Sequence, residues 1–223
     1  MEGVGEAEGW RADGERRPRE VAPARPAATV ILLRDGEDGL ELLLVRRTPK
    51  ASFMGGVWVF PGGAVDRRDA PVDPAGAGSP DDSDAHALRG AALRELREEA
   101  GIELAGTDEL VEFSRWITPK VVPKRFDTSF FLARGPAGQE PRVDGEECVA
   151  YGWFSPRAAL AAHEAKEIVL VFPTIKHLEQ LGQFDSVAEL LTYTRGRPVQ
   201  PVAPRVVMEG EVARVLLPGE PGY

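Results

Sequence analysis

The sequence predicts an α/β fold, in which strands and helices pack in layers around one core. Three observations carry this prediction. Short apolar runs typical of strands come first, a long helical segment with an acidic face lies in the middle, and short helical segments lie near the end. The 223 residues are 43% hydrophobic and 28% charged, which suits one domain with extensions. This pattern alone does not choose a sheet topology.

The chain begins with a segment whose composition is unlike that of a folded domain. Residues 1–26 are rich in Glu, Gly, Arg and Pro, so we expect a disordered N-terminal tail. Residues 27–33 and 40–45 predict a buried strand and its return strand, because the polar, Gly-containing segment between them suits a hairpin turn. Residues 57–60 predict a further short strand before the long helix.

The second half predicts further strands and three short helices. Aromatic and β-branched residues favour strands at 110–117 and 125–133. Ser155 and Pro156 suit the N-cap and the first position of a helix that ends near residue 163. The remaining expected elements are a strand at 149–154, helices at 174–181 and 187–193, and a late strand at 211–217.

Three carboxylates lie close together on the long helix, which we expect to begin near residue 83. Glu95, Glu98 and Glu99 fall within roughly 100° of one another on the helix surface. They repel one another and lie in the last turn, where the helix dipole disfavours negative charge. Mg²⁺ or Mn²⁺ would neutralise them, since these cations prefer oxygen ligands. The alternative is a solvated acidic face with salt bridges.

A glycine turn that precedes this helix favours the metal site. Gly62 and Gly63 allow a close approach of the backbone to a ligand, or they offer a bare carbonyl as a metal ligand. This turn, followed by the run from Arg94 to Ile102, resembles the Nudix box of the Nudix hydrolase family. The second half of the box is matched at every defined position.

The first half of the box departs from the family pattern. Asp69 occupies the position of the first Glu, counted from Gly63. Residues 70–93 then separate Asp69 from Arg94, which is more than the pattern has. We therefore expect an insertion at about 70–84, a stretch rich in Pro, Gly, Asp and Ser.

The resemblance implies a Nudix-type α/β/α sandwich with a mixed sheet. We expect this domain to span residues 27–195, followed by a Pro-rich C-terminal extension at 196–223. It also implies a pyrophosphohydrolase that cleaves a phosphoanhydride in a nucleoside diphosphate linked to another moiety. Such a reaction needs charge neutralisation and an activated water molecule, which Mg²⁺ or Mn²⁺ supplies.

The same resemblance assigns roles to the residues of the box. Glu98 and Glu99 would ligate the metal ion, and Glu95 would be a third ligand or a base that orients water. Arg94 would hold a glutamate by a charge-assisted hydrogen bond. The carbonyl of Gly62 would be a backbone ligand.

Family members often add a carboxylate from a distant loop. Glu146 and Glu147, just before the strand at 149–154, are the candidates, and of the two we take Glu147 as the metal ligand. The alternative is a solvated loop acid.

Several cations are candidates for binding the phosphates of a substrate. They are Arg46, Lys120, Lys124 and Arg125, and a solvated loop is the alternative for each of them. Motifs such as 116–119 and 125–128 are similar to those of the Nudix branch that includes peroxisomal coenzyme A diphosphatases. This similarity implies coenzyme A or acyl-CoA as substrate, with 3′,5′-ADP and phosphopantetheine as products. ADP-ribose, NADH or nucleoside triphosphates are alternative substrates, and a non-catalytic ligand sensor is an alternative of another class.

Composition sets expectations about partners and compartment. A net charge of −9 and a pI near 5.0 argue against a nucleic-acid or anionic-membrane binder, so we expect a small nucleotide-type substrate. The single cysteine, Cys148, fits a reducing compartment, and we expect a cytoplasmic protein. The family resemblance adds a homodimer as a further expectation.

Overall fold

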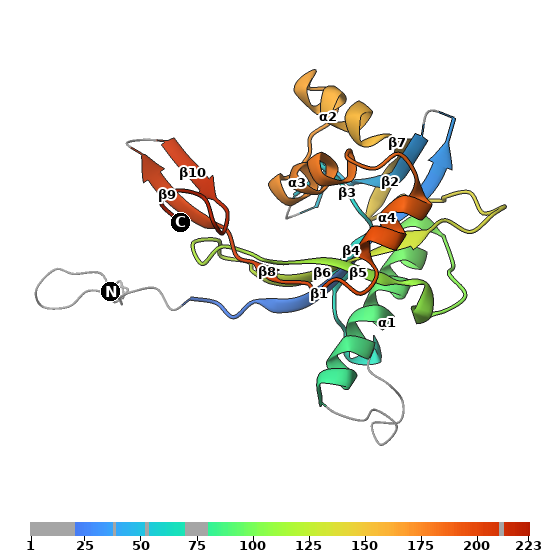
Figure 1. Ribbon diagram of the computed structural model, residues 1–223, viewed down its shortest axis with the longest axis horizontal. Coiled ribbons are helices and arrows are strands. Elements are labelled where there is room, and N and C mark those ends of the chain that lie inside the picture. The colour runs from blue at the N-terminus through green and yellow to red at the C-terminus, as the bar shows by residue number, and fades with distance from the viewer. Residues whose placement is uncertain (1–20, 38, 52–53, 70–79, 210–211) are drawn as a thin grey trace, which may run out of the picture.

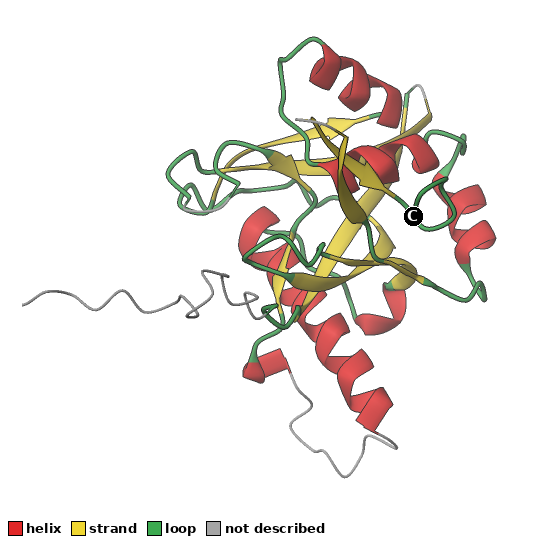
Figure 2. Cartoon of the chain, turned by 90° about the vertical axis from the view of Figure 1, so that its left-hand side faces the viewer, coloured by secondary structure: helices red, strands yellow, loops and turns green. Residues whose placement is uncertain are grey.

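The protein has three layers, with a sheet between two sets of helices. A computed structural model describes residues 21–37, 39–51, 54–69, 80–209 and 212–223. In Figure 1, α1 (Pro80–Ala100) lies on one side of the sheet, and α2 (Pro156–Glu164) and α3 (Phe172–Leu181) lie on the other. The view turned by 90° shows the long helix α1 running below the strands (Figure 2). The predicted α/β/α sandwich is therefore confirmed.

The sheet is mixed, as the family resemblance implied. Within the described residues it has eight strands, and six of them run side by side in the order β3-β2-β1-β6-β5-β8, while β4 pairs with β1 and β7 with β2. The β1–β6 and β5–β8 pairs are parallel and the other pairs are antiparallel. The strands are β1 (Arg25–Gly36), β2 (Gly39–Arg47), β3 (Trp58–Val59), β4 (Gly62–Ala64), β5 (Val111–Ile117), β6 (Phe126–Arg134), β7 (Cys148–Phe154) and β8 (Pro201–Val202).

The strand β1 changes partner along one of its edges. Its last residues pair with β2, with Leu33 opposite Leu42, while Thr29 lies opposite Gly62 of β4. Its other edge pairs with β6 over nine residues. The glycine turn of the predicted box therefore lies in the sheet, beside the first half of the central strand.

Alternation along the strands fills both sides of the sheet with apolar side chains. In β1, Val30 and Leu32 pack toward α1, whereas Ile31 and Leu33 pack on the opposite side. The helix α1 meets its side of the sheet through small and aliphatic residues, Ala91, Ala92, Leu96 and Ala100. Small side chains let α1 lie close to the sheet, which brings its polar face near β4.

The opposite side is covered by α2, α3 and α4 (Val187–Thr194). The predicted caps are present, because the Ser155 hydroxyl accepts a hydrogen bond from the Ala158 N–H at 3.2 Å and Pro156 occupies the first turn. Ser186 caps α4 in the same way. Among the described residues, no helix has the length and apolar character needed to cross a bilayer.

Several boundaries differ from those expected. The strand β1 begins at Arg25, inside the segment expected to be a tail, and α1 begins at Pro80, so residues 80–84 of the expected insertion are helical. Residues 1–20 and 70–79 of the tail and the insertion lie outside the described residues. Apolar periodicity could not set these ends, because neither Arg25 nor the polar start of α1 contributes to it.

The C-terminal extension contains more structure than its Pro content indicates. The strand β8 joins the edge of the sheet next to β5. The strands β9 (Arg205–Glu209) and β10 (Val212–Leu216) form a separate hairpin, which stands off the main body in Figure 1. The predicted late strand corresponds to β10. Short strands such as β4 and β8 were missed because pairing, rather than composition, specifies them.

Candidate active site

A cavity of about 330 Å³ lies where β1, β4, β6 and α1 meet. Three carboxylates and three cations line it, together with small, hydroxyl and aromatic side chains. The charged lining residues are Glu95, Glu99, Glu147, Arg25, Arg47 and Lys124. The cavity thus brings residues of the box helix together with residues from β1, β2, β4, β6 and the loop before β7.

Glu99 is the most buried acid of the site. Its side chain is 3% exposed, and the Gly62 N–H donates a hydrogen bond to its Oε2 at 2.9 Å. The Arg47 guanidinium lies 3.7 Å from its Oε1. Burial raises the pKa of Glu99 to about 7; the Gly62 N–H and Arg47 oppose this rise, and the charges of Glu95 and Glu147 add to it. Glu99 is therefore a desolvated carboxylate with an incomplete set of partners.

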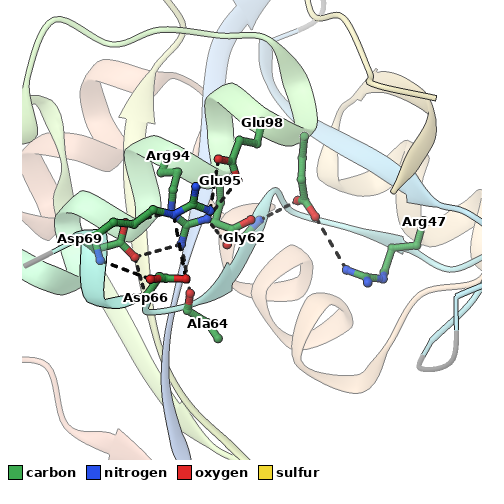
Figure 3. A network of polar contacts seen from close by, with 10 residues as sticks. Arg47, Gly62, Ala64, Asp66, Asp69, Arg94, Glu95 and Glu98 are labelled. Carbon is green, nitrogen blue, oxygen red and sulfur yellow. Dashed lines mark hydrogen bonds and ion pairs between the residues drawn. The ribbon is translucent and has the colours of Figure 1, made fainter. Parts of the chain in front are cut away.

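Arg94 binds the other two carboxylates of the box, Glu95 and Glu98, and also Asp69 of η1 (Figure 3). Its guanidinium binds Asp69 in a bidentate manner, at 2.8 and 2.9 Å, and it also donates to Glu95 at 2.6 Å and to Glu98 at 3.1 Å. A further bond runs to the Ala64 carbonyl at 3.1 Å. The predicted hydrogen bond from Arg94 to a glutamate is therefore present, and Arg94 binds Asp69 as well.

Asp69 ends a short 3-10 helix, η1 (Arg67–Asp69), directly before the expected insertion. Burial alone would raise its pKa, but the hydrogen bonds from Arg94 and from the Asp66 N–H bring the pKa below its usual value. A side chain at Gly90 of α1 would place its Cβ 2.8 Å from the Asp69 carbonyl oxygen. The glycine thus lets α1 approach η1 closely enough for the Arg94–Asp69 pair to form.

Glu95 reaches the cavity beside the glycine turn. A Cβ on Gly63 would overlap the Glu95 carboxylate, so only glycine fits that position with Glu95 as it lies. Burial raises the pKa of Glu95, although Arg94 opposes this change and the charges of Glu98 and Glu147 add to it. Glu95 therefore lines the cavity and binds a proton more readily than an exposed glutamate does.

Glu98 lies apart from these two acids. Its side chain is 39% exposed, and its carboxylate is bound by Arg94 and by Arg68, the latter at 3.4 Å. It is not part of the cavity lining. The structure thus brings together two of the three predicted box carboxylates, and the role of Glu98 as a metal ligand stays a prediction.

The loop before β7 carries the fourth predicted carboxylate to the site. Asp144 accepts hydrogen bonds from the backbone N–H groups of Glu147 and Cys148, and the Glu147 carbonyl accepts one from the Thr48 N–H at 2.8 Å. These contacts fix the loop to the end of β2. Glu147 lines the cavity and its neighbour Glu146 does not.

The predicted phosphate-binding cations are distributed over three places. Lys124 lines the cavity. Lys120 and Arg125 line a separate hollow beside the C-terminal segment, where Arg125 donates to the carbonyls of Thr118 and Ala22. Arg46 contacts the Gly56 carbonyl, outside the lining. The substrate contacts of all four stay predictions.

Arg25 also lines the cavity, although the sequence did not predict it as a site residue. The predicted strand began at residue 27, so Arg25 was assigned to the tail. Extending the same strand by two residues would have placed Arg25, Ala27 and Thr29 on one face, because alternate residues of a strand share a face. In the described part of the chain, no three acidic, histidine or cysteine side chains converge as a ready-made metal site.

Comparisons with known proteins agree with this geometry. A family model described as the NUDIX domain matches residues 23–172. The solved structure of a NUDIX hydrolase from Alicyclobacillus acidocaldarius is similar, with a TM-score of 0.67 and 30% identity, covering 80% of this chain and all of that one.

Two curated relatives extend the comparison. The chain is 29% identical to "Putative nudix hydrolase 7" of Caenorhabditis elegans over 71% of its own length, and it spans 61% of that protein. It is 26% identical to the acyl-coenzyme A diphosphatase NUDT19 of Homo sapiens, covering 95% of this chain and 78% of the relative. Because the family domain covers well over half of the chain, the protein belongs to the Nudix family and is a Nudix hydrolase.

Proposed function

We propose that the protein hydrolyses the diphosphate of coenzyme A or acyl-CoA, releasing 3′,5′-ADP and phosphopantetheine or its acyl form. The observation that carries this proposal is the similarity to the human acyl-coenzyme A diphosphatase, which extends over 95% of the chain. The cavity supports it by combining carboxylates for a metal ion with cations for phosphate. Hydrolysis of a phosphoanhydride is the part of this activity that the family itself establishes.

The donor atoms at the site fit a divalent cation. Hard cations prefer oxygen ligands, and the raised pKa values of Glu95 and Glu99 reflect burial and repulsion that a cation would offset. We propose that Mg²⁺ or Mn²⁺ is held by the Gly62 carbonyl and by the four carboxylates Glu95, Glu98, Glu99 and Glu147. When bound, the ion neutralises phosphate oxygens and makes water a stronger nucleophile.

Residues around the cavity would orient the carboxylates, position the attacking water and bind the diphosphate. The Gly62 N–H fixes the orientation of Glu99, and Arg94 fixes Glu95. In the alternative role, in which Glu95 does not ligate the ion, it would orient the attacking water and accept its proton, because it lines the cavity and its pKa is raised. Arg47 faces the same space and can bind the diphosphate.

Product analysis tests the proposal. The purified protein is incubated with coenzyme A, acetyl-CoA, ADP-ribose, NADH or dGTP, each with Mg²⁺ or Mn²⁺, and the products are separated by chromatography. We expect 3′,5′-ADP from coenzyme A, and we expect its release to be lost in Glu99→Gln. Turnover confined to another nucleotide would refute coenzyme A as the substrate. No turnover of any compound would favour a ligand sensor.

We propose a homodimer, which light scattering coupled to size-exclusion chromatography would test. We also propose a cytoplasmic location, and fluorescence microscopy of the tagged full-length protein would check it.

A further inference from the structure

The floor of the cavity is formed by two parallel strands whose side chains alternate. Arg25, Ala27 and Thr29 of β1 and Phe126 and Thr128 of β6 face the cavity, and Lys124, two residues before β6, lines it as well. The register places Arg25 beside Phe126 and Ala27 beside Thr128. Because the strand ladder fixes these pairs, the position of Arg25 relative to Thr29, at the opposite end of the floor, is defined.

The two ends of this floor lie far apart. Thr29 is opposite Gly62, whose N–H holds the Glu99 carboxylate. Arg25 precedes Thr29 by four residues, which corresponds to about 13 Å along an extended strand. A diphosphate bound near Glu99 would leave Arg25 beyond the reach of its own oxygens, and a ribose could span the interval.

The outer end carries positive charge beside an aromatic ring. The Lys124 ammonium lies 5.5 Å from the centroid of the Phe126 ring. Arg25 has no ion-pair partner among the residues that the structure describes, whereas Arg47 at the inner end lies 3.7 Å from Glu99. The cavity is therefore acidic near α1 and cationic near the start of β1 and β6.

We propose that this outer end, formed by Arg25, Lys124 and Phe126, is a subsite for a nucleoside that bears a phosphate in addition to the scissile diphosphate. This inference rests on the proposed function and names the part of the substrate that gives selectivity. The Arg25 guanidinium offers paired donors that match phosphate oxygens, and Lys124 adds a second cation. The Phe126 ring offers a face against which a base can stack.

Ligand binding measured by calorimetry tests the subsite without requiring turnover. Adenosine 3′,5′-bisphosphate and AMP are titrated into the full-length protein in one buffer containing Mg²⁺. We expect the bisphosphate to bind the wild-type protein about tenfold more tightly, since one charge-assisted contact contributes roughly this factor. Arg25→Gln and Lys124→Gln should each lose most of that preference while their affinity for AMP changes less than about twofold.

Arg157→Gln is the matched control, because Arg157 is exposed on α2 and is not part of the cavity lining. It should keep the wild-type preference, and thermal unfolding checks that each variant is folded. Equal affinity of the wild-type protein for the two ligands would overturn the subsite. So would an equal loss for both ligands in the variants, or no measurable binding of either ligand.

A parallel assay separates this inference from the proposed function. Hydrolysis of coenzyme A and of 3′-dephospho-coenzyme A is measured with the same proteins. If the wild-type protein hydrolyses neither compound but still prefers the bisphosphate, the proposed substrate is wrong and the subsite stands. If it hydrolyses both with the same kcat/KM and shows no preference in calorimetry, the subsite is wrong and the proposed reaction stands.

Discussion

Glu98 and Glu99 are neighbours on α1, yet they lie in opposite electrostatic surroundings. Glu98 is 39% exposed and is bound by two arginines, whereas Glu99 is 3% exposed and has one close hydrogen bond, from a backbone N–H. Burial raises the pKa of Glu99 to about 7. The comparison shows that two acids on one helical face can differ in solvation because of what packs against each of them. Changing one partner at a time tests how far this difference determines their roles.

The largest expected effect comes from removing the charge of Glu99. Glu99→Gln keeps the volume of the side chain but removes a negative charge from the cavity, so turnover should fall at least about 10³-fold. Steady-state kinetics on the substrate identified by product analysis measures this loss. Glu98→Gln is the comparison, and we expect a smaller loss of about 10–100-fold, because Glu98 is more exposed than Glu99 and its charge is already balanced by Arg68 and Arg94. Equal losses would show that the two acids act alike.

Breaking the Arg94–Asp69 pair should lower both the free energy of unfolding and the turnover of the enzyme. Asp69→Asn removes the bidentate partner of a guanidinium whose side chain is only 11% exposed, and the free energy of unfolding should fall by about 2–4 kcal/mol. Turnover should fall about 10–100-fold, because Glu95 loses its fixed orientation. Urea unfolding and kinetics measure the two effects. Asp66→Asn is the control, since the Asp66 side chain is 55% exposed. If Asp66→Asn lowered the free energy of unfolding and turnover as much as Asp69→Asn does, the role of Asp69 would be contradicted.

The stability of the metal-free protein should depend on pH through Glu99. Its pKa is about 7 in the folded state against 4.5 in the unfolded state, so the unfolded chain loses its proton first as pH rises. The stabilising contribution is complete below pH 4.5 and is lost as pH rises through about 7, and it amounts to roughly 1–3 kcal/mol. Unfolding in the presence of a chelator, for wild type and Glu99→Gln, measures the difference. Parallel pH curves for the two proteins would contradict it.

The smallest effect is expected at Arg68, which binds Glu98 from the solvent side. Arg68→Gln removes an ion pair at 3.4 Å from a side chain that is 60% exposed, and such pairs contribute about 0–1 kcal/mol. We therefore expect turnover within about threefold of wild type, measured at low and high salt. A larger loss would mean that Arg68 contacts the substrate.

The sequence predicted much of the fold because its signals are local. Apolar runs identified the long strands, and Ser155 caps its helix in the expected way. The glycines of β4 were interpreted as a turn that offers a backbone ligand to a metal ion, and their place in the sheet, where Gly62 pairs with Thr29, was not predicted. Pairing between distant residues specifies a strand of three residues, and no local pattern records it.

The candidate site was predicted as a set of residue types rather than as an arrangement. The helical spacing of Glu95, Glu98 and Glu99 was correct, but spacing on one helix treats the three acids alike. Their difference comes from Gly62, which lies 37 residues before Glu99, and from Arg94, which occupies the side facing η1. Arg25 was missed because a charged first residue of a strand resembles a tail.

The Arg94–Asp69 pair also bears on how the chain can be lengthened. It joins Asp69 directly to Arg94 of α1, so this contact is made by residues on either side of segment 70–79. Closing a longer loop between fixed ends adds only about 0.6 kcal/mol for each doubling of its length. Extra residues inserted between Asp69 and Pro80 should therefore leave the Arg94–Asp69 pair, and with it the position of Glu95, unchanged.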